Sequence, residues 1–260
     1  MAEPLQDDPR VAEIAAGLDG VRRRIADAAA AAGRADLPEL IVVSKTHPAE
    51  DVVALAGLGV RQVGENRDQE ARPKAAAVAE ALGGAGVPAP AWHFIGQLQT
   101  NKAKHVARYA SAVHSVDRLD LVDALSRAVV LRREREGADA VSALDCLVQV
   151  DVDDRADEDR PEGIGPRGGA APEDVPELAR AIAAADGLRL RGLMCVAPRA
   201  ADPAAAFARL AALSARVRAE HPDADALSMG MSGDLEAAVA AGATHVRVGS
   251  DILGARGAVG

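Results

Sequence analysis

The segment LIVVSKTHPAEDVVALAGLGVRQVGEN (Leu40–Asn66) contains the structural unit from which the fold can be predicted. It begins with a short run of branched apolar residues, Leu40–Ser44, which is typical of a buried strand. An alanine-rich stretch of helical length, Pro48–Leu58, comes next, and the run Val60–Gly64 follows it. A strand, a helix and a second strand in this order predict a right-handed crossover between parallel strands.

The same unit recurs along the chain. Further runs of strand character are Trp92–Ile95, Ala112–Val116, Leu144–Val152, Leu190–Val196, Ala226–Met229 and Val246–Val248. Segments of helical length separate most of them, namely Asp68–Leu82, Arg118–Glu136, Pro172–Ala185, Asp202–Glu220 and Asp234–Ala241. Eight units of roughly 30 residues each predict an α/β fold, a single (β/α)8 TIM barrel.

Three segments lie outside the regular repeat. Val11–Ala32 predicts an additional N-terminal helix before the first strand. The helix expected after Phe94 is short, so the third unit is the least regular. The polar, Gly/Pro-rich tract Asp153–Ala171 predicts a loop after the fifth strand. No boundary is visible elsewhere, and residues 1–260 are expected to form one domain.

Composition excludes several classes of function. The chain has 39 acidic and 30 basic side chains, a formal net charge of −9, which argues against a nucleic-acid or anionic membrane partner. Aromatic residues make up 2% of the chain, too few for base stacking. Two cysteines, no secretory signal and no long apolar run indicate a cytoplasmic location. A small-molecule ligand is therefore expected.

In a barrel of this kind the site is built from loops at the carboxyl ends of the strands. Lys45 directly follows the first apolar run. Partial burial there would lower the pKa of its amine, and a neutral amine attacks aldehydes. A lysine whose stem packs on the strand while its head stays in water is the alternative, and the position alone leaves both open.

A second group of residues follows the seventh and eighth strands. Barrels often bind phosphate there, and Ser232, Gly249 and Ser250 could supply hydroxyls and a close backbone approach, although ordinary turns use the same residues. Arg247 points to the same side of its strand as Gly249. Its buried guanidinium needs an acceptor, either a pyridine nitrogen or a carboxylate. An amine facing a phosphate site fits pyridoxal 5′-phosphate (PLP).

Other reactive residues do not form a recognisable site. The six histidines lack the spacing of metal ligands, and no metal site is expected. Cys146 and Cys195 lie within apolar runs and are expected to be buried and unreactive.

Several long motifs stand out along the chain, namely VVSKTHPAE (Val42–Glu50), GENRDQEARPK (Gly64–Lys74), WHFIGQLQTNK (Trp92–Lys102), VHSVD (Val113–Asp117), GLMCVAP (Gly192–Pro198) and LSMGMSGDLEAAVAAGATHVRVGSDILGAR (Leu227–Arg256). Taken together, these motifs resemble those of a known family, the pyridoxal phosphate homeostasis proteins. The resemblance extends from about Leu40 onward. It departs from the family pattern at Ser250, where threonine is usual, and at Leu253, where phenylalanine is usual.

The resemblance implies a (β/α)8 barrel similar to the N-terminal domain of bacterial alanine racemases, holding PLP as an internal aldimine on Lys45. It places Asn66 near the cofactor ring and Arg247 opposite the pyridine nitrogen. It assigns the phosphate to Ser232, Gly249 and Ser250. The residues implied to line the rest of the pocket are Met194, Met229 and Gly230.

The expected function is reversible binding of PLP for intracellular homeostasis, by buffering or delivery, without robust turnover and with no catalytic residue. Racemases of this fold take a second acid/base, a tyrosine, from an added C-terminal domain of a partner subunit. Here the one tyrosine, Tyr109, lies in a helix-like stretch after the third strand.

An arginine at the ring nitrogen also weakens PLP as an electron sink. A weak amino-acid racemase or lyase is the alternative, and a sugar-phosphate-binding barrel is a third possibility. The expected partners are PLP and PLP-dependent apo-enzymes, with the protein a monomer or weak dimer.

Overall fold

The strands close into one barrel. The structure, a computed structural model, describes residues 8–155, 168–198 and 202–254. Eight parallel strands pair in chain order from β1 to β8, and β8 pairs with β1. They are β1 (Glu39–Val43), β2 (Gln62–Glu65), β3 (Ala91–Phe94), β4 (Ala110–Val116), β5 (Leu144–Gln149), β6 (Leu188–Met194), β7 (Ala226–Ser228) and β8 (His245–Val248). The predicted (β/α)8 barrel is confirmed.

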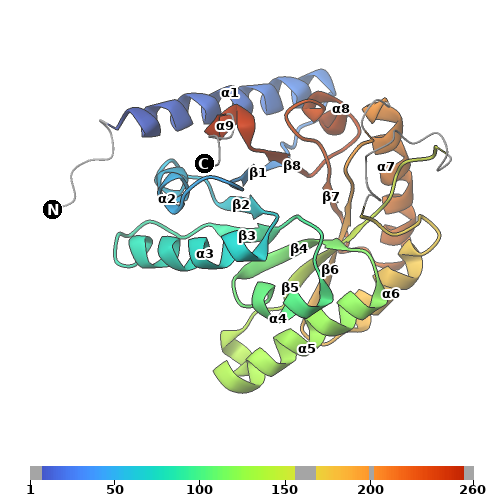
Figure 1. The fold of residues 1–260 in the computed structure, drawn as a ribbon. Helices are drawn as coiled ribbons and strands as arrows, with labels where there is room; N and C mark the ends of the chain where they lie inside the picture. Colours follow the sequence, from blue (N-terminus) through green and yellow to red (C-terminus); the bar gives the residue numbers. More distant parts are fainter. Residues whose placement is uncertain (1–7, 156–167, 199–201, 255–260) are drawn as a thin grey trace.

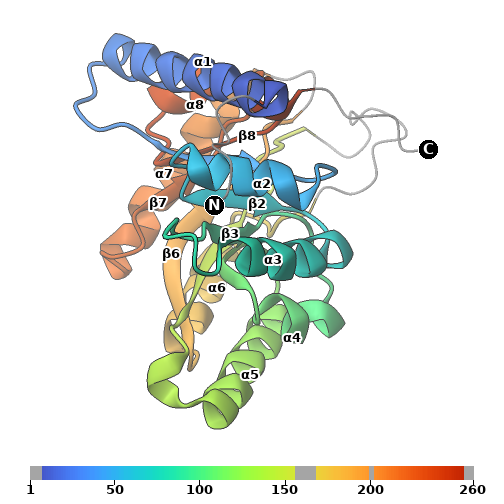
Figure 2. The same cartoon turned by 90° about the vertical axis from the view of Figure 1, so that its left-hand side faces the viewer.

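Helices surround the barrel on the outside (Figures 1 and 2). They are α2 (Ala49–Gly57), α3 (Asp68–Leu82), α4 (Ala103–Val106), α5 (Leu119–Glu136), α6 (Val175–Ala184), α7 (Pro203–Glu220) and α8 (Leu235–Ala240). Two 3₁₀ turns, η2 (Thr100–Lys102) and η3 (Ala138–Ala140), precede α4 and follow α5. The third unit is short, as expected, because one 3₁₀ turn and one helical turn are all that join β3 to β4.

The N-terminal helix α1 (Pro9–Ala31) completes the ring of helices. It packs against α8, α2 and α9 (Ser250–Leu253), which is only one turn long (Figure 1). In a regular barrel the helix after the last strand fills this place. Asp8 caps the helix by accepting the Arg10 N–H at 2.8 Å. The buried face of α1 consists of residues at helical spacing, namely Ile14, Leu18, Val21, Ile25, Ala28 and Ala29.

Every strand differs from its predicted run by one to three residues at one or both ends, and two of these differences have a visible cause. The run Val60–Gly64 becomes β2 only from Gln62, because the Val60 N–H bonds to Leu55 O and so closes the end of α2. The run Leu144–Val152 ends as β5 at Gln149, because the Asp151 N–H turns to Ala170 O. Helix α9 was not predicted, since four residues are too few to show periodicity.

Two sequence predictions fall partly on residues that are not described. Of the predicted loop Asp153–Ala171, residues 156–167 lie outside the described residues, and the parts on either side contain one bridge, between Val150 and Ala170. The final residues of the last family motif, 255 and 256, also lie outside. Within the described ranges, no helix is long and apolar enough to span a membrane.

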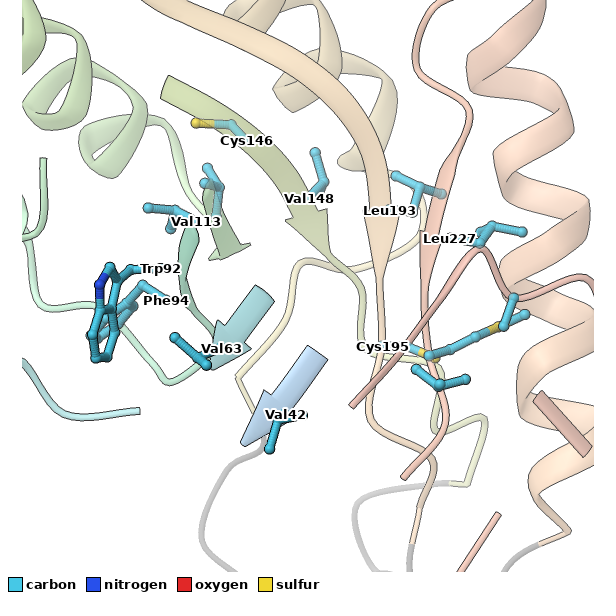
Figure 3. Packing of buried hydrophobic residues seen from close by; sticks show 14 of the residues in the cluster. Val42, Val63, Trp92, Phe94, Val113, Cys146, Val148, Leu193, Cys195 and Leu227 are labelled. Atoms are coloured by element: carbon cyan, nitrogen blue, oxygen red, sulfur yellow. The ribbon is translucent and has the colours of Figure 1, made fainter. Parts of the chain in front are cut away.

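The strands alternate between two environments. Outward-facing residues such as Val42, Val63 and Leu193 pack with helix residues in the main hydrophobic core, and Figure 3 shows members of this core on successive strands. A separate small apolar cluster, Leu147, Met194 and Ala226, lies apart from that core. These residues alternate with core members along β5, β6 and β7, so they face the inside of the barrel. The inside therefore contains a limited apolar core.

Candidate functional site

A cavity of about 260 Å³ opens at the carboxyl ends of β1, β7 and β8. It is lined by Val43, Lys45, Thr46, His47, Met231, Ser232, Gly233, Arg247, Gly249, Ser250 and Gly254. Among the described residues, this lining includes a lysine, an arginine and a histidine but no carboxylate. The chain as a whole carries a net charge of −9. The positive wall of the cavity therefore favours an anionic ligand.

Lys45 lies in a tight turn directly after β1. Side chains alternate along the strand, so Ile41 and Val43 point to the same side as Lys45. The chain then reverses between Ser44 and His47, whose N–H donates to Ser44 O at 3.1 Å. Thr46 occupies the third position of this turn at φ 66°, a conformation that favours glycine or asparagine. Because of this turn, Lys45, Thr46 and His47 all line the cavity.

A buried ion pair behind β1 holds the turn in place. Lys74 Nζ of α3 donates to Ser44 O at 2.8 Å and to Glu65 Oε1 at 2.6 Å. Ser44 Oγ donates to the same carboxylate oxygen at 2.8 Å. Burial raises the pKa of Glu65, while the Lys74 ammonium opposes that shift. In addition, Glu70 accepts the Thr46 N–H at 3.2 Å, so the strained turn has support on both sides.

Two serine hydroxyls also line the cavity. Ser232 Oγ and Ser250 Oγ lie 3.4 Å apart. A side chain at Gly249 would place its Cβ 2.8 Å from Val43 O, so glycine lets the end of β8 approach the end of β1. Arg24 of α1 donates to Ser232 O at 2.9 Å and pairs with Asp251 at 2.6 Å. Helix α1 thus fixes both serine-bearing loops.

Arg247 forms the inner wall. Its side chain is buried and donates to Ser228 Oγ at 2.7 Å and to Cys195 O at 2.8 Å. No carboxylate pairs with it within the described part of the chain, so the ion pair considered as one alternative is not formed there. Burial lowers its pKa from the ordinary value of an arginine.

Five of the nine predicted site residues line this cavity, namely Lys45, Ser232, Arg247, Gly249 and Ser250. The other four do not line it. Asn66 follows β2 beside Gly96, where an added Cβ would overlap the Asn66 backbone. Met194 lies in the inner apolar cluster and Met229 in the main core. Gly230, at φ 91°, packs so closely against Ala238 of α8 that a Cβ would overlap it.

Thr46, His47 and Met231 also line the cavity, although they were not among the predicted site residues. The sequence interpretation of Met231 as a core residue, like Met229, is wrong, because its side chain is exposed. His47 Nδ1 lies 3.4 Å from the Asp51 carboxylate, which Arg10 binds at 2.6 Å. Burial lowers the pKa of His47, with Asp51 opposing the shift, so the ring is neutral near pH 7. In the sequence, His47 could have been recognised by its position two residues after Lys45, in a turn. Tyr109, by contrast, has a buried hydroxyl and does not line the cavity.

Comparison with known proteins identifies the family. The family described as "Alanine racemase, N-terminal domain" matches residues 17–257. A relative from Mycobacterium tuberculosis H37Rv, named pyridoxal phosphate homeostasis protein, is 43% identical over 98% of each chain. The chain belongs to the pyridoxal phosphate homeostasis protein family. The resemblance seen in the sequence motifs is thereby confirmed.

Solved structures agree with membership of the pyridoxal phosphate homeostasis protein family. A protein described as unknown from Bifidobacterium adolescentis is 32% identical, with a TM-score of 0.82 over 95% of this chain and 96% of its own. PipY of Synechococcus elongatus PCC7942, in a structure described as having PLP bound, is 29% identical. Its TM-score is 0.71, and the match covers 92% of this chain and 99% of PipY. The barrel is therefore shared along nearly the whole length of these proteins.

Proposed function

We propose that this protein binds PLP reversibly in the cavity between Lys45 and the two serines and serves in PLP homeostasis. The observation that carries the proposal is the lining itself, which combines a lysine, a buried arginine and paired hydroxyls, with no acidic residue among its described members. A phosphate monoester that also carries an aldehyde matches this set of groups. The relative named pyridoxal phosphate homeostasis protein and the PLP-bound structure of PipY support the same ligand.

Each wall of the cavity has a part in this function. When bound, PLP supplies an aldehyde that condenses reversibly with a primary amine. Lys45 provides that amine, and the turn between Ser44 and His47 directs it into the cavity. Ser232 and Ser250 would donate hydroxyl hydrogens to the phosphate, with Gly249 keeping the wall close. Arg247 would act as a fixed donor toward the ring nitrogen. Contacts of the ligand with Asn66, Met194, Met229 and Gly230 stay predictions.

The test of this function is covalent attachment of PLP. The wild-type protein mixed with PLP and reduced with borohydride should gain the mass of one reduced PLP on Lys45, located by peptide mass spectrometry. Lys45→Ala should lose both this adduct and the visible absorbance of lysine-bound PLP. Lys104→Ala is the matched control, because Lys104 is exposed on α4 and should leave both signals unchanged. Stoichiometric reducible PLP in Lys45→Ala would refute the proposal.

We further propose that the protein holds and releases PLP without robust turnover of an amino acid. Two-base chemistry needs a proton donor on each face of the substrate, and Tyr109 does not reach the cavity. The PLP-loaded protein incubated with single amino acids should show neither racemisation nor keto-acid release above about one turnover per minute. Turnover of about one per second or more, as in ordinary enzymes, would contradict this.

A weak racemase or lyase remains the second candidate, and His47 is the observation that favours it. His47 shares the cavity with Lys45 and is oriented by Asp51, as the base of a catalytic dyad is. If slow turnover is found, His47→Gln should reduce it at least tenfold while leaving PLP attachment at Lys45 intact. Turnover unaffected by His47→Gln would remove this candidate's acid/base.

We propose PLP-dependent apo-enzymes as the recipients, with residues 1–260 acting as one domain and the protein a monomer or weak dimer. Two free, buried cysteines are consistent with a reducing, cytoplasmic location.

Transfer is tested by mixing the PLP-loaded protein with a purified apo-enzyme and following recovery of the activity of that enzyme. Recovery faster than the release of PLP into buffer alone would support delivery, and equal rates would restrict the function to buffering.

A further inference from the structure

A chain of hydrogen-bonded side chains crosses the inside of the barrel behind the cavity. His93 Nδ1 of β3 lies 2.8 Å from His114 Nε2 of β4. His114 Nδ1 lies 2.9 Å from Ser228 Oγ of β7, and Arg247 Nη1 of β8 donates to that oxygen at 2.7 Å. Four strands therefore contribute one residue each to a continuous path that ends at the wall of the cavity.

These residues are deeply buried. Their exposed fractions are 9% for His93, 1% for His114, 0% for Ser228 and 4% for Arg247. In β3 the neighbours Trp92 and Phe94 belong to the main core outside the barrel, so His93 faces inward. A polar path inside a barrel is costly unless each member is paired, and here each hydrogen bond links one member to the next.

The chemistry of the donors fixes the direction of the path. A guanidinium has only donors, so Ser228 Oγ accepts from Arg247. The Ser228 hydroxyl hydrogen is then available for His114 Nδ1, which must be unprotonated. A neutral His114 carries its proton on Nε2 and donates it to His93 Nδ1. The opposite direction would leave the buried serine hydrogen without an acceptor in this path, at a cost of about 1–3 kcal/mol.

Charge favours the same direction. The inside of the barrel also contains His245, whose ring lies edge-on to His114 with centroids 6.4 Å apart. Burial lowers the pKa of His93 to about 4 and that of His114 well below its ordinary value, with Arg247 adding to the effect on His114. Both rings are thus neutral near pH 7, and the acceptor atom of each lies on the side of the path that leads to Arg247.

We propose that His93, His114 and Ser228 are positioning residues, which orient Arg247 in the cavity wall by a one-directional chain of hydrogen bonds. This inference rests on the proposed PLP function, because the wall that Arg247 forms is the one assigned to the ring nitrogen. The path supplies the guanidinium with an acceptor that carries no negative charge. Arg247 is therefore held in place by neutral acceptors, and no carboxylate among the described residues neutralises its charge.

The first experiment needs no ligand. Nitrogen-15 NMR of the imidazoles in the ligand-free protein should show His93 and His114 neutral at pH 7, each protonated on Nε2. Ser228→Ala should change the tautomer or the Nδ1 shift of His114, whereas His105→Gln, on the outside of the barrel, should not. A protonated or Nδ1-protonated His114 in the wild-type protein would overturn the proposed direction.

The second experiment separates positioning from packing. The amide of His114→Asn can replace Nδ1 and keep the bond to Ser228, while that of His114→Gln can replace Nε2 and keep only the bond to His93. PLP affinity, measured by absorbance titration, should stay within about threefold of wild type in the asparagine variant. It should fall about tenfold in the glutamine variant and in Ser228→Ala.

The outcomes distinguish the two proposals. Equal losses of affinity in His114→Asn and His114→Gln would mean that the histidine only fills space and would overturn the positioning role. If the wild-type protein does not bind PLP, the proposed function fails, and the NMR result on the ligand-free protein still decides the direction of the path. Should Ser228→Ala fail to fold, Ser228→Cys, a smaller change, replaces it in both experiments.

Discussion

Thr46 holds a backbone conformation that its own side chain disfavours. A β-branched residue at φ 66° costs about 1–2 kcal/mol, and the surroundings must hold it there. Glu70 accepts its N–H, and the Ser44 carbonyl before it is bound by Lys74 and by the His47 N–H. Because Thr46 lies next to Lys45, the contacts that hold this strained residue also hold the turn that carries the proposed PLP-binding amine.

Replacing Thr46 with glycine tests this strain. Thr46→Gly relieves the conformational cost but adds unfolded-state entropy, so the free energy of unfolding should rise by about 0–1 kcal/mol. Thr46→Pro, which cannot adopt a positive φ and has no N–H for Glu70, should lose about 3 kcal/mol. Urea denaturation measures both. A clear loss of stability in Thr46→Gly would show that the turn is not strained.

At the scale of residues, the sequence identifies the groups with distinctive chemistry but not the geometry that joins them. Lys45 could be predicted as a cavity residue because it follows an apolar strand. Thr46 and His47 could not, because turn rules expect glycine or asparagine at the position that Thr46 occupies. Met229 and Met231 illustrate the same limit, since only the turn after β7 decides that Met231 lines the cavity and Met229 joins the core.

At the scale of elements, α1 and α9 approach each other closely through one glycine. A Cβ on Gly17 would lie 2.8 Å from the carbonyl oxygens of Asp251 and Ile252, whereas one on Gly20 of the same helix would meet nothing within 4 Å. Gly17→Ala should therefore destabilise the protein by about 1–3 kcal/mol, and Gly20→Ala should stabilise it by about 0.5–1 kcal/mol.

The same pair of variants tests how α1 supports the cavity. Helix α9 begins at Ser250, so displacing it in Gly17→Ala should also weaken PLP binding, which Gly20→Ala leaves unchanged. Thermal unfolding and absorbance titration of the two variants provide the measurement. Equal behaviour of the two alanines in both assays would contradict the close contact.

The ion pair between β2 and α3 is a second link between elements. Lys74→Met leaves Glu65 buried without its partner, and should lower the free energy of unfolding by about 3–5 kcal/mol. The double variant Lys74→Met/Glu65→Met removes both charges and should recover more than half of this loss. Chemical denaturation of the single and double variants is the measurement, and a double variant no more stable than Lys74→Met would contradict the explanation.

The ends of the elements were harder to predict than their existence. The buried face of α1 was visible from its spacing. The start of β2 was not, because the Val60 N–H serves the end of α2 and no pattern of apolar residues records that. Likewise β5 stops at Gln149 although Val150 and Val152 continue the apolar pattern, since the backbone there turns to Ala170.

At the scale of the whole molecule, the buried histidines predict that the free energy of unfolding decreases at acidic pH, a decrease called the acid limb below. Because burial lowers the pKa of His93 to about 4, the unfolded chain binds more protons than the folded one between pH 4 and 6.5. The contribution of His93 to the free energy of unfolding is complete above pH 6.5 and is lost as the pH falls toward 4. The free energy of unfolding should drop by about 2 kcal/mol from pH 7 to pH 5 for His93 alone.

Urea denaturation at several pH values measures this limb. His114 should add to it in the same direction, because its pKa is lowered too. His93→Gln should flatten the limb, whereas His105→Gln, outside the barrel, should leave it nearly unchanged. A limb of equal depth in His93→Gln would show that the ring is already charged in the folded protein.

The barrel itself could be predicted by counting alternating strands and helices, and the motifs predicted the family. The polar path inside it could not, because it joins residues of β3, β4, β7 and β8 that are far apart in the chain. Periodicity predicts which residues face inward, but neighbours across a closed barrel follow from its register.

The cavity draws its walls from distant parts of the sequence, from Val43 at the end of the first strand to Gly254 beyond the last. A chain still being synthesised on the ribosome therefore exposes its lysine long before the opposite hydroxyls exist. Such a partial chain lacks part of the cavity wall, so the proposed PLP site can form only after β8 has closed the barrel.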